Sequence, residues 1–175
     1  MTRAFTAIPI PEEKAEKLAE LQSELPGKKV RPEKMHITFE FFKDLDELEV
    51  AEIKTFLESL DTKPFEVKIK GLGAFPSKSF IRVLWAGIDS SEIKQLFEKV
   101  SENSIDSDND HEFRPHITLS RVNDLKKTEK KKVHQALHDY SDLCFDSFTA
   151  DKLVLYESEM TSEGSRYREL YVKNL

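Results

Sequence analysis

The chain has 175 residues and a net charge of −6, with 34% charged and 38% hydrophobic side chains, a balance typical of a globular protein and not of a disordered one. The acidic excess argues against a protein that coats nucleic acid through a general positive field, because such binding depends on many phosphate contacts, although a local basic site is still allowed. The single cysteine cannot form an internal disulfide, and no stretch approaches the roughly 20 apolar residues that span a bilayer, so we expect a cytoplasmic protein without membrane contact. Its length predicts one domain over residues 1–175.

The first half of the chain alternates strand and helix patterns. Hydrophobic periodicity, together with proline and glycine punctuation, predicts strands at residues 4–8, 35–42 and 65–69 and helices at residues 12–25 and 44–60.

The second half repeats this order. The same signals predict strands at residues 79–85, 116–121, 143–157 and 167–172 and helices at residues 90–100 and 124–140, with a polar connection at 101–110. Two similar halves of this kind predict an α+β fold with two lobes and a cleft between them.

Each half carries one copy of His-Ile-Thr, at residues 36–38 and 116–118, and each copy stands at the start of a predicted strand. With five histidines in the chain, a shared triplet of this kind arises by chance in on the order of a few in a hundred sequences. Each copy also follows an Arg-Pro pair. Because residues i and i+2 of a strand face the same way, each copy presents an imidazole and a hydroxyl on one wall.

Two such walls would suit a phosphodiester. A neutral imidazole can take a proton from a nucleophile while an imidazolium on the opposite side gives one to the leaving group. Two threonine hydroxyls can then bind the non-bridging oxygens between them. The spacing alone leaves open that the histidines only cap sheet edges and that the threonines merely suit strands.

The motifs resemble a known family. HITFEF and PHITLSR resemble the paired His-x-Thr-x motifs of the 2H phosphoesterase superfamily, and the surrounding blocks resemble its bacterial and archaeal RNA 2′,3′-cyclic phosphodiesterases, also called 2′-5′ RNA ligases. The resemblance covers nearly the whole chain, including GLGAFPSKSFIRVLWAGI and LVLYESEMTSEGSRYREL. Two positions depart from it: no aromatic residue precedes the first motif in KKVRPEKMH, and Phe42-Lys43 replaces the usual Leu-Gly. Both lie beside the site, so they concern substrate detail more than reaction type.

The resemblance implies a bilobal fold in which two pseudo-symmetric antiparallel sheets form a central cleft with helices outside. It also implies metal-independent hydrolysis of 2′,3′-cyclic phosphate ends of RNA or nucleotides to 2′-phosphates, by a monomer without cofactor. His36 would be the proton donor and His116 the proton acceptor, and Thr38, Thr118 and Arg121 would bind the phosphate. The alternatives are 2′-5′ RNA ligation by the same site and a non-catalytic module that binds RNA ends.

For several residues the sequence alone allows two interpretations of their role. Strict alternation turns Arg121 away from His116, so its side chain reaches the site only with a bulge or at a strand end. The basic segment with Lys28, Lys29, Arg31 and Lys34 either steers RNA or is simply solvated.

For the other chemically active side chains we expect a structural role and not a functional one. His134 and His138 lie four apart on a predicted helix, but without a third ligand we expect a solvated face and no metal. We expect Cys144 and Trp85 in the core, while Phe5 and Phe42 suit either packing or base stacking.

Overall fold

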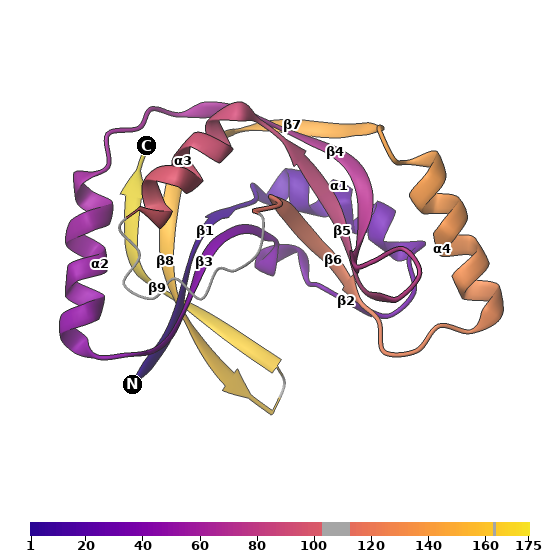
Figure 1. Ribbon diagram of the computed structural model, residues 1–175, viewed down its shortest axis with the longest axis horizontal. Helices are drawn as coiled ribbons and strands as arrows, with labels where there is room; N and C mark the ends of the chain where they lie inside the picture. Colours follow the sequence, from indigo (N-terminus) through magenta and orange to yellow (C-terminus); the bar gives the residue numbers. More distant parts are fainter. Residues whose placement is uncertain (103–112, 163) are drawn as a thin grey trace.

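A computed structural model describes residues 1–102, 113–162 and 164–175, and in these residues the strands form one strongly curled antiparallel sheet (Figure 1). The strand order is β7-β4-β5-β6-β3-β1-β8-β9, with the short β2 paired to β6. The strands are β1 Thr2–Pro9, β2 Lys28–Lys29, β3 His36–Leu45, β4 Phe65–Pro76, β5 Ile81–Asp89, β6 His116–Arg121, β7 Cys144–Ala150, β8 Lys152–Thr161 and β9 Gly164–Asn174.

The sheet consists of two lobes. One lobe holds β3, β1, β8 and β9, and the other holds β6, β5, β4 and β7. Within the described sheet the lobes meet between β3 and β6 at one registered pair, Ile37 and Ile117, and both side chains are fully buried. The expected bilobal α+β fold is therefore confirmed, and its two expected sheets are joined at this seam into one.

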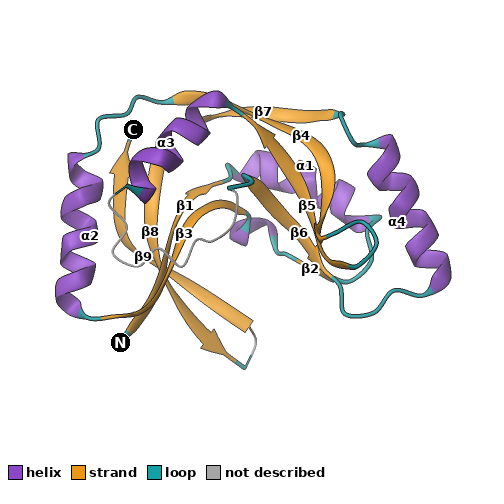
Figure 2. Cartoon of the chain, viewed as in Figure 1, coloured by secondary structure: helices purple, strands orange, loops and turns teal. Residues whose placement is uncertain are grey.

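The described chain has four α-helices, of which α2 and α4 lie at the two ends of the molecule and α1 and α3 between them (Figure 2). They are α1 Glu12–Ser23, α2 Glu47–Ser59, α3 Ser91–Ser101 and α4 Lys127–Asp139, and a 3-10 turn, η1, spans Pro32–Lys34. Two of them cross between lobes: α1 follows β1 but contacts β6 and β7, and α3 follows β5 but contacts β3. The two lobes are thus tied together by helices as well as by the seam.

Local sequence signals set the helix starts. The Asp46 carboxylate accepts hydrogen bonds from the backbone N–H groups of Leu48 and Glu49 at 2.8 and 2.9 Å, and the Glu49 carboxylate accepts one from the Asp46 N–H. This capping box starts α2 at Glu47, three residues later than the periodicity predicted, because β3 continues to Leu45. Ser90 caps α3 in a similar way.

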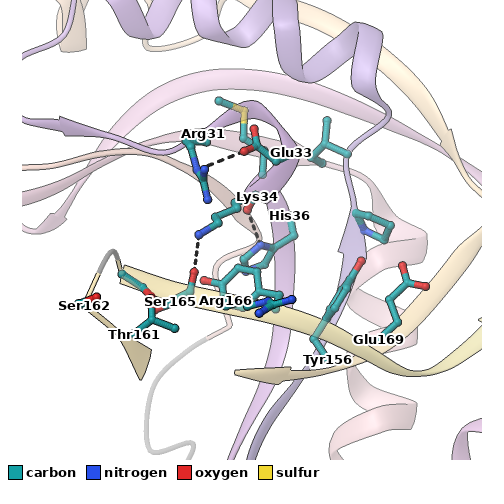
Figure 3. Close-up of a pocket in the computed structure, with 15 residues that line it drawn as sticks. Arg31, Glu33, Lys34, His36, Tyr156, Thr161, Ser162, Ser165, Arg166 and Glu169 are labelled. Carbon is teal, nitrogen blue, oxygen red and sulfur yellow. Dashed lines mark hydrogen bonds and ion pairs between the residues drawn. The ribbon is translucent and has the colours of Figure 1, made fainter. Parts of the chain in front are cut away.

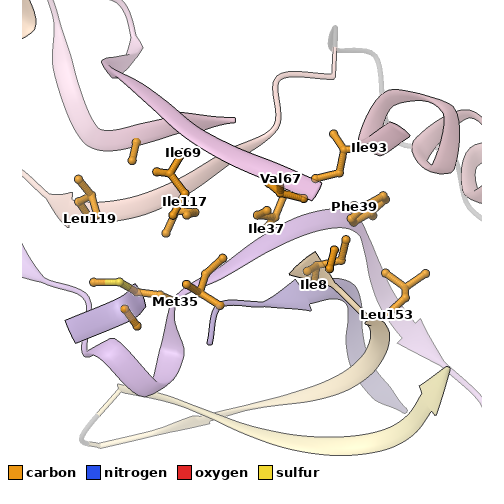
Figure 4. Packing of buried hydrophobic residues seen from close by; sticks show 14 of the residues in the cluster. Ile8, Met35, Ile37, Phe39, Val67, Ile69, Ile93, Ile117, Leu119 and Leu153 are labelled. Atoms are coloured by element: carbon orange, nitrogen blue, oxygen red, sulfur yellow. The ribbon is translucent and has the colours of Figure 1, made fainter. Parts of the chain in front are cut away.

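One hydrophobic core serves both lobes (Figure 4). Ile37, Ile117 and Leu119 from the seam pack in the same cluster as Ile69 of β4 and Leu153 of β8. Each buried side chain of this size stabilises the fold by about 1.5–3 kcal/mol relative to an exposed one. The residues that alternate with this core on β3 and β6 are consequently held on the cleft side.

Two sequence predictions differ from the structure. The predicted strand at 143–157 is two strands, β7 and β8, separated by Asp151, and the predicted strand at 65–69 continues to Pro76. Hydrophobicity does not reveal either difference. The boundary between β7 and β8 is a single polar residue, Asp151, although the two strands belong to different lobes. Most of the predicted polar connection, residues 103–110, lies outside the described residues. No helix in the described part of the chain is long and apolar enough to cross a bilayer.

Candidate active site

The two His-Ile-Thr copies meet at the seam between the lobes. His36 is the first residue of β3 and His116 the first of β6. Since Ile37 pairs with Ile117 in antiparallel register, His36 lies opposite Thr118, and Thr38 lies opposite His116. The two isoleucines point into the core, so all four polar side chains face the cleft.

Both imidazoles are held in the same way. His36 Nδ1 lies 2.7 Å from the Lys34 carbonyl oxygen (Figure 3), and His116 Nδ1 lies 2.7 Å from the Arg114 carbonyl oxygen. A carbonyl oxygen only accepts, so Nδ1 carries the proton and donates in each case. The other nitrogen, Nε2, is then the atom that can accept or give a proton in the cleft.

The site disfavours positive charge on either imidazole. Burial lowers the pKa of His36 to about 4, and the positive charges of His116 and Arg121 act in the same direction. Burial also lowers the pKa of His116, again helped by Arg121. Both rings are therefore neutral at pH 7 in the free protein. A bound anion would raise both pKa values, because it stabilises the imidazolium form.

A bulge brings Arg121 into the cleft. Along β6, Thr118 pairs with Trp85 and Ser120 with Leu84, so Leu119 is an extra residue in the ladder. Leu119 and Ser120 are consequently both buried, and Arg121 emerges on the side of Thr118. Strict alternation along β6 would turn the Arg121 side chain away from His116, and this does not hold. The structure contains the bulge that the sequence analysis required for Arg121 to reach the site. The influence of Arg121 on both histidines agrees with this placement.

The bulge is held by the last turn of α1 and by the segment that follows it. Gln22 Nε2 donates hydrogen bonds to the carbonyl oxygens of Leu119 and Val30 at 2.5 and 2.6 Å, and the Val30 N–H also donates to Leu119. Gly27 has φ +89°, and a Cβ there would collide with the Arg121 carbonyl oxygen. The sequence analysis did not identify Gln22. The sequence does contain a sign of its role, because Gln22 is a polar residue four positions after Leu18, on the apolar face of the helix.

The same bulge occurs in the other lobe and exposes a different side chain. Along β3, Thr38 pairs with Ala7 and Glu40 with Thr6, so Phe39 is the extra residue. Phe41 then takes the place that Arg121 has in β6, and its side chain is 63% exposed. Phe5 and Phe42 are buried, which resolves their two readings in favour of packing.

Aromatic rings support both histidines. The Phe5 ring lies 4.9 Å from that of His36, and the Phe75 ring lies 4.9 Å from that of His116 with its edge toward it. Trp85 also contacts His116, at 5.9 Å between centroids. These rings limit the rotation of the imidazoles. The prediction that Trp85 lies in the core was wrong, because its side chain is half-buried on the cleft side, where Trp85 pairs with Thr118.

The remaining candidates lie elsewhere. His134 and His138 are exposed on α4, as the solvated reading predicted. Among residues 1–102, 113–162 and 164–175, no group of three potential metal ligands gathers. The prediction that Cys144 lies in the core was wrong, since its side chain is exposed at the first position of the edge strand β7.

Comparison with known proteins identifies a matching family and similar proteins from other organisms. The family described as LigT like phosphoesterase matches residues 8–85 and 88–167. An RNA 2′,3′-cyclic phosphodiesterase of Methanocaldococcus jannaschii is 32% identical over 170 residues, which cover 94% of this chain and 96% of that protein. The protein of the same name from Archaeoglobus fulgidus is 30% identical, with 97% and 98% covered.

Solved structures agree in fold. A protein of Thermus thermophilus superimposes with a TM-score of 0.79 at 26% identity, covering 99% of this chain and 97% of that one. Escherichia coli LigT in its apo form superimposes with a TM-score of 0.82 at 22% identity, with the same coverage.

Proposed function

Because this chain belongs to the family of LigT-like phosphoesterases, we propose that it hydrolyses 2′,3′-cyclic phosphate ends of RNA to 2′-phosphates. One observation carries the proposal: two imidazoles, each with Nδ1 bonded to a carbonyl, present Nε2 to the same cleft between two threonines and Arg121. The M. jannaschii and A. fulgidus relatives are named for this activity, which supports the assignment.

In the proposed reaction, His116 is the base and His36 the acid. Neutral His116 accepts a proton at Nε2 from water as the water oxygen attacks phosphorus. The bond between phosphorus and the ribose 3′ oxygen breaks, and that oxygen takes the proton from His36 Nε2. The product carries a 2′-phosphate and a 3′-hydroxyl, and the two histidines have exchanged protonation states. Solvent then resets them.

The threonines and Arg121 have an electrostatic role in this proposal. The hydroxyls of Thr38 and Thr118 would donate to the two non-bridging oxygens, and the guanidinium of Arg121 would balance their charge. The anion they hold also raises the pKa of His36, which favours the protonated form that the acid requires. In this proposal the negative charge of the bound phosphate both holds the substrate and favours protonation of the acid.

The deciding experiment uses an oligonucleotide that ends in a 2′,3′-cyclic phosphate, incubated in excess chelator and analysed by mass spectrometry. We expect a product heavier by one water molecule that carries a 2′-phosphate. Because no metal takes part in the proposed steps, the chelator should leave the rate unchanged. A 3′-phosphate would contradict the proposed leaving group, a joined product would indicate ligation with a 5′-hydroxyl in place of water, and binding without turnover would indicate a non-catalytic module.

We further propose that the enzyme works as a cytoplasmic monomer. Both histidine motifs come from one chain, so a second copy is not needed to complete the site. Light scattering coupled to size exclusion should give the mass of a single chain, 20.3 kDa. A dimer mass would contradict this part of the proposal.

A further inference from the structure

A pocket of about 640 Å³ opens beside His36, between η1 and the β8–β9 hairpin (Figure 3). The η1 side contributes Arg31, Glu33 and Lys34, and the hairpin contributes Tyr156, Arg166, Tyr167 and Glu169. Its volume lies within the range of about 300–1,000 Å³ that small-molecule sites occupy. The pocket includes His36 but not His116, Thr38 or Thr118, so it extends from the acid side of the site only.

The proposed reaction explains why the acid side needs space. Attack on phosphorus proceeds in line, with the nucleophile and the leaving oxygen on opposite sides. The nucleophile is water, which approaches from His116. The leaving oxygen belongs to the ribose, so the terminal nucleoside and the RNA chain attached to it lie on the side of His36.

The walls of this pocket suit a ribose-phosphate chain. Three cationic side chains face it against two carboxylates, in a chain whose net charge is −6. Arg31 Nε lies 3.1 Å from a Glu33 carboxylate oxygen, and no described carboxylate lies within ion-pair distance of the Arg166 guanidinium. Lys34 donates to the Ser165 carbonyl oxygen and lies 5.7 Å from the centre of the Tyr167 ring. Lys34 therefore fixes the hairpin against η1, while Arg31 and Arg166 are placed to meet phosphate.

From this placement, and resting on the proposed function, we infer that the pocket beside His36 binds the RNA chain from the terminal nucleoside to the phosphodiester that joins it to the penultimate nucleotide. That phosphodiester lies against Arg166 and Arg31, and the rings of Tyr156 and Tyr167 offer surfaces for a base. The preferred substrate is accordingly an RNA end of two or more nucleotides and not a cyclic mononucleotide. Of the two sequence readings of the basic segment, this assigns Arg31 to RNA binding.

The test compares kcat/KM for a 2′,3′-cyclic mononucleotide with that for the dinucleotide that ends in the same nucleotide. We expect the unaltered protein to prefer the dinucleotide at least about tenfold, since a charge-assisted hydrogen bond to the extra phosphate contributes that much. Arg166→Ala combined with Arg31→Ala should lower this ratio at least about tenfold. Arg168→Ala is the matched control, because it removes the same charge from the same strand outside the pocket, where Arg168 pairs with Glu157.

Salt dependence gives a second measurement. The logarithm of kcat/KM for the dinucleotide should fall more steeply with salt than that for the mononucleotide, by a slope of about 0.7 for one added phosphate contact, and the double variant should lose this difference. A ratio near one in the unaltered protein, or a ratio that the double variant leaves at its original value, would overturn the inference while the proposed function stands. Absence of turnover of both substrates would refute the proposed function and this inference with it.

Discussion

The two lobes present the same proton-transfer group in different surroundings. In each, a histidine opens a strand, its Nδ1 bonds to the carbonyl two residues earlier, and a threonine follows on the cleft side. In each, a bulge follows the threonine. In the proposed reaction these features would orient Nε2 and hold a phosphate oxygen. The geometry that the proposal assigns to proton transfer is therefore the same in both lobes.

The lobes differ at the positions that contact what surrounds the phosphate. After the bulge, β3 exposes Phe41 where β6 exposes Arg121. Opposite the threonine, β1 has Ala7 where β5 has Trp85, and the Trp85 ring fits only because Gly73 lies beneath it, where a Cβ would overlap the indole. The comparison teaches that the histidine and threonine geometry is repeated in both lobes, while the side chains around it, Arg121 and Trp85 in one lobe and Phe41 and Ala7 in the other, differ.

The largest expected effect tests the symmetric part. His36→Ala and His116→Ala should each lower kcat by about 10²–10⁴-fold, the usual loss for one positioned proton-transfer group. His134→Ala, on the exposed face of α4, is the matched control and should retain full turnover. Steady-state kinetics on a cyclic-phosphate oligonucleotide, with circular dichroism to check folding, measures this. Full turnover without His116 would remove it from the mechanism.

A substrate with an activated leaving group separates the two roles. A phosphodiester with a nitrophenolate leaving group needs no proton from the acid, so we expect His36→Ala to cost less than about tenfold on it, while His116→Ala costs as much as on RNA. The quantity to compare is the ratio of kcat/KM between variant and unaltered protein for the two substrates. Rescue of His116→Ala instead would reverse the assigned roles.

The phosphate ligands should contribute less than the histidines. Thr38→Val, Thr118→Val and Arg121→Ala each remove a donor to a charged oxygen, worth about 1.5–3 kcal/mol, so kcat/KM should fall by about 10–100-fold. Phe41→Ala changes the position that corresponds to Arg121 without removing a donor, and its effect should be smaller. Equal losses at Arg121 and Phe41 would contradict the assignment of charge to the β6 lobe.

A smaller effect is expected from the support of the bulge. Gln22→Leu removes one buried and one partly buried hydrogen bond and leaves the Val30 carbonyl without this donor, at a cost of about 1–3 kcal/mol in unfolding free energy. For a chain of this size that lowers the melting temperature by roughly 2–4 °C per kcal/mol. Because Arg121 should then be less well oriented, the loss of kcat/KM caused by Arg121→Ala should shrink in the Gln22→Leu background. Additive losses would show that Gln22 stabilises the fold only.

The pH profile is the finest test of the comparison. Burial lowers the pKa of each histidine, to about 4 for His36, so the form of the pair that carries a single proton is most abundant at a lower pH than for two ordinary histidines. The bell of kcat/KM, which reports the free protein, should therefore be centred below about 6.5. The bell of kcat should lie higher, because the bound phosphate raises both pKa values. An optimum of kcat/KM above about pH 7 would contradict this order, although the limbs belong to the pair and not to either ring alone.

Sequence analysis predicted the parts of the site that depend on local pattern. His36, Thr38, His116 and Thr118 share a face because alternation within a strand is a local property, and the structure places them together. Arg121 could not be placed from β6 alone, since its direction depends on a bulge that pairs with β5 and is held by Gln22. The pocket beside His36 could not be predicted from the sequence either, because its two walls, η1 and the β8–β9 hairpin, lie far apart in the chain.

The crossing of the chain between lobes determines the order in which they can be built during synthesis. The His116 lobe uses β4 to β7, a contiguous stretch from Phe65 to Ala150, whereas the His36 lobe needs β1 and β3 from the start of the sequence and β8 and β9 from its end. The His116 lobe can pair its strands as soon as Ala150 has left the ribosome. In the other lobe β1 can pair early with β3, but its other edge must wait for β8, about 150 residues away. Pairing at such separation is slow, because a long loop must be closed first. A chain that ended before β8 would therefore contain every strand of the His116 lobe, while the β1–β3 pair that holds His36 would lack β8 and β9.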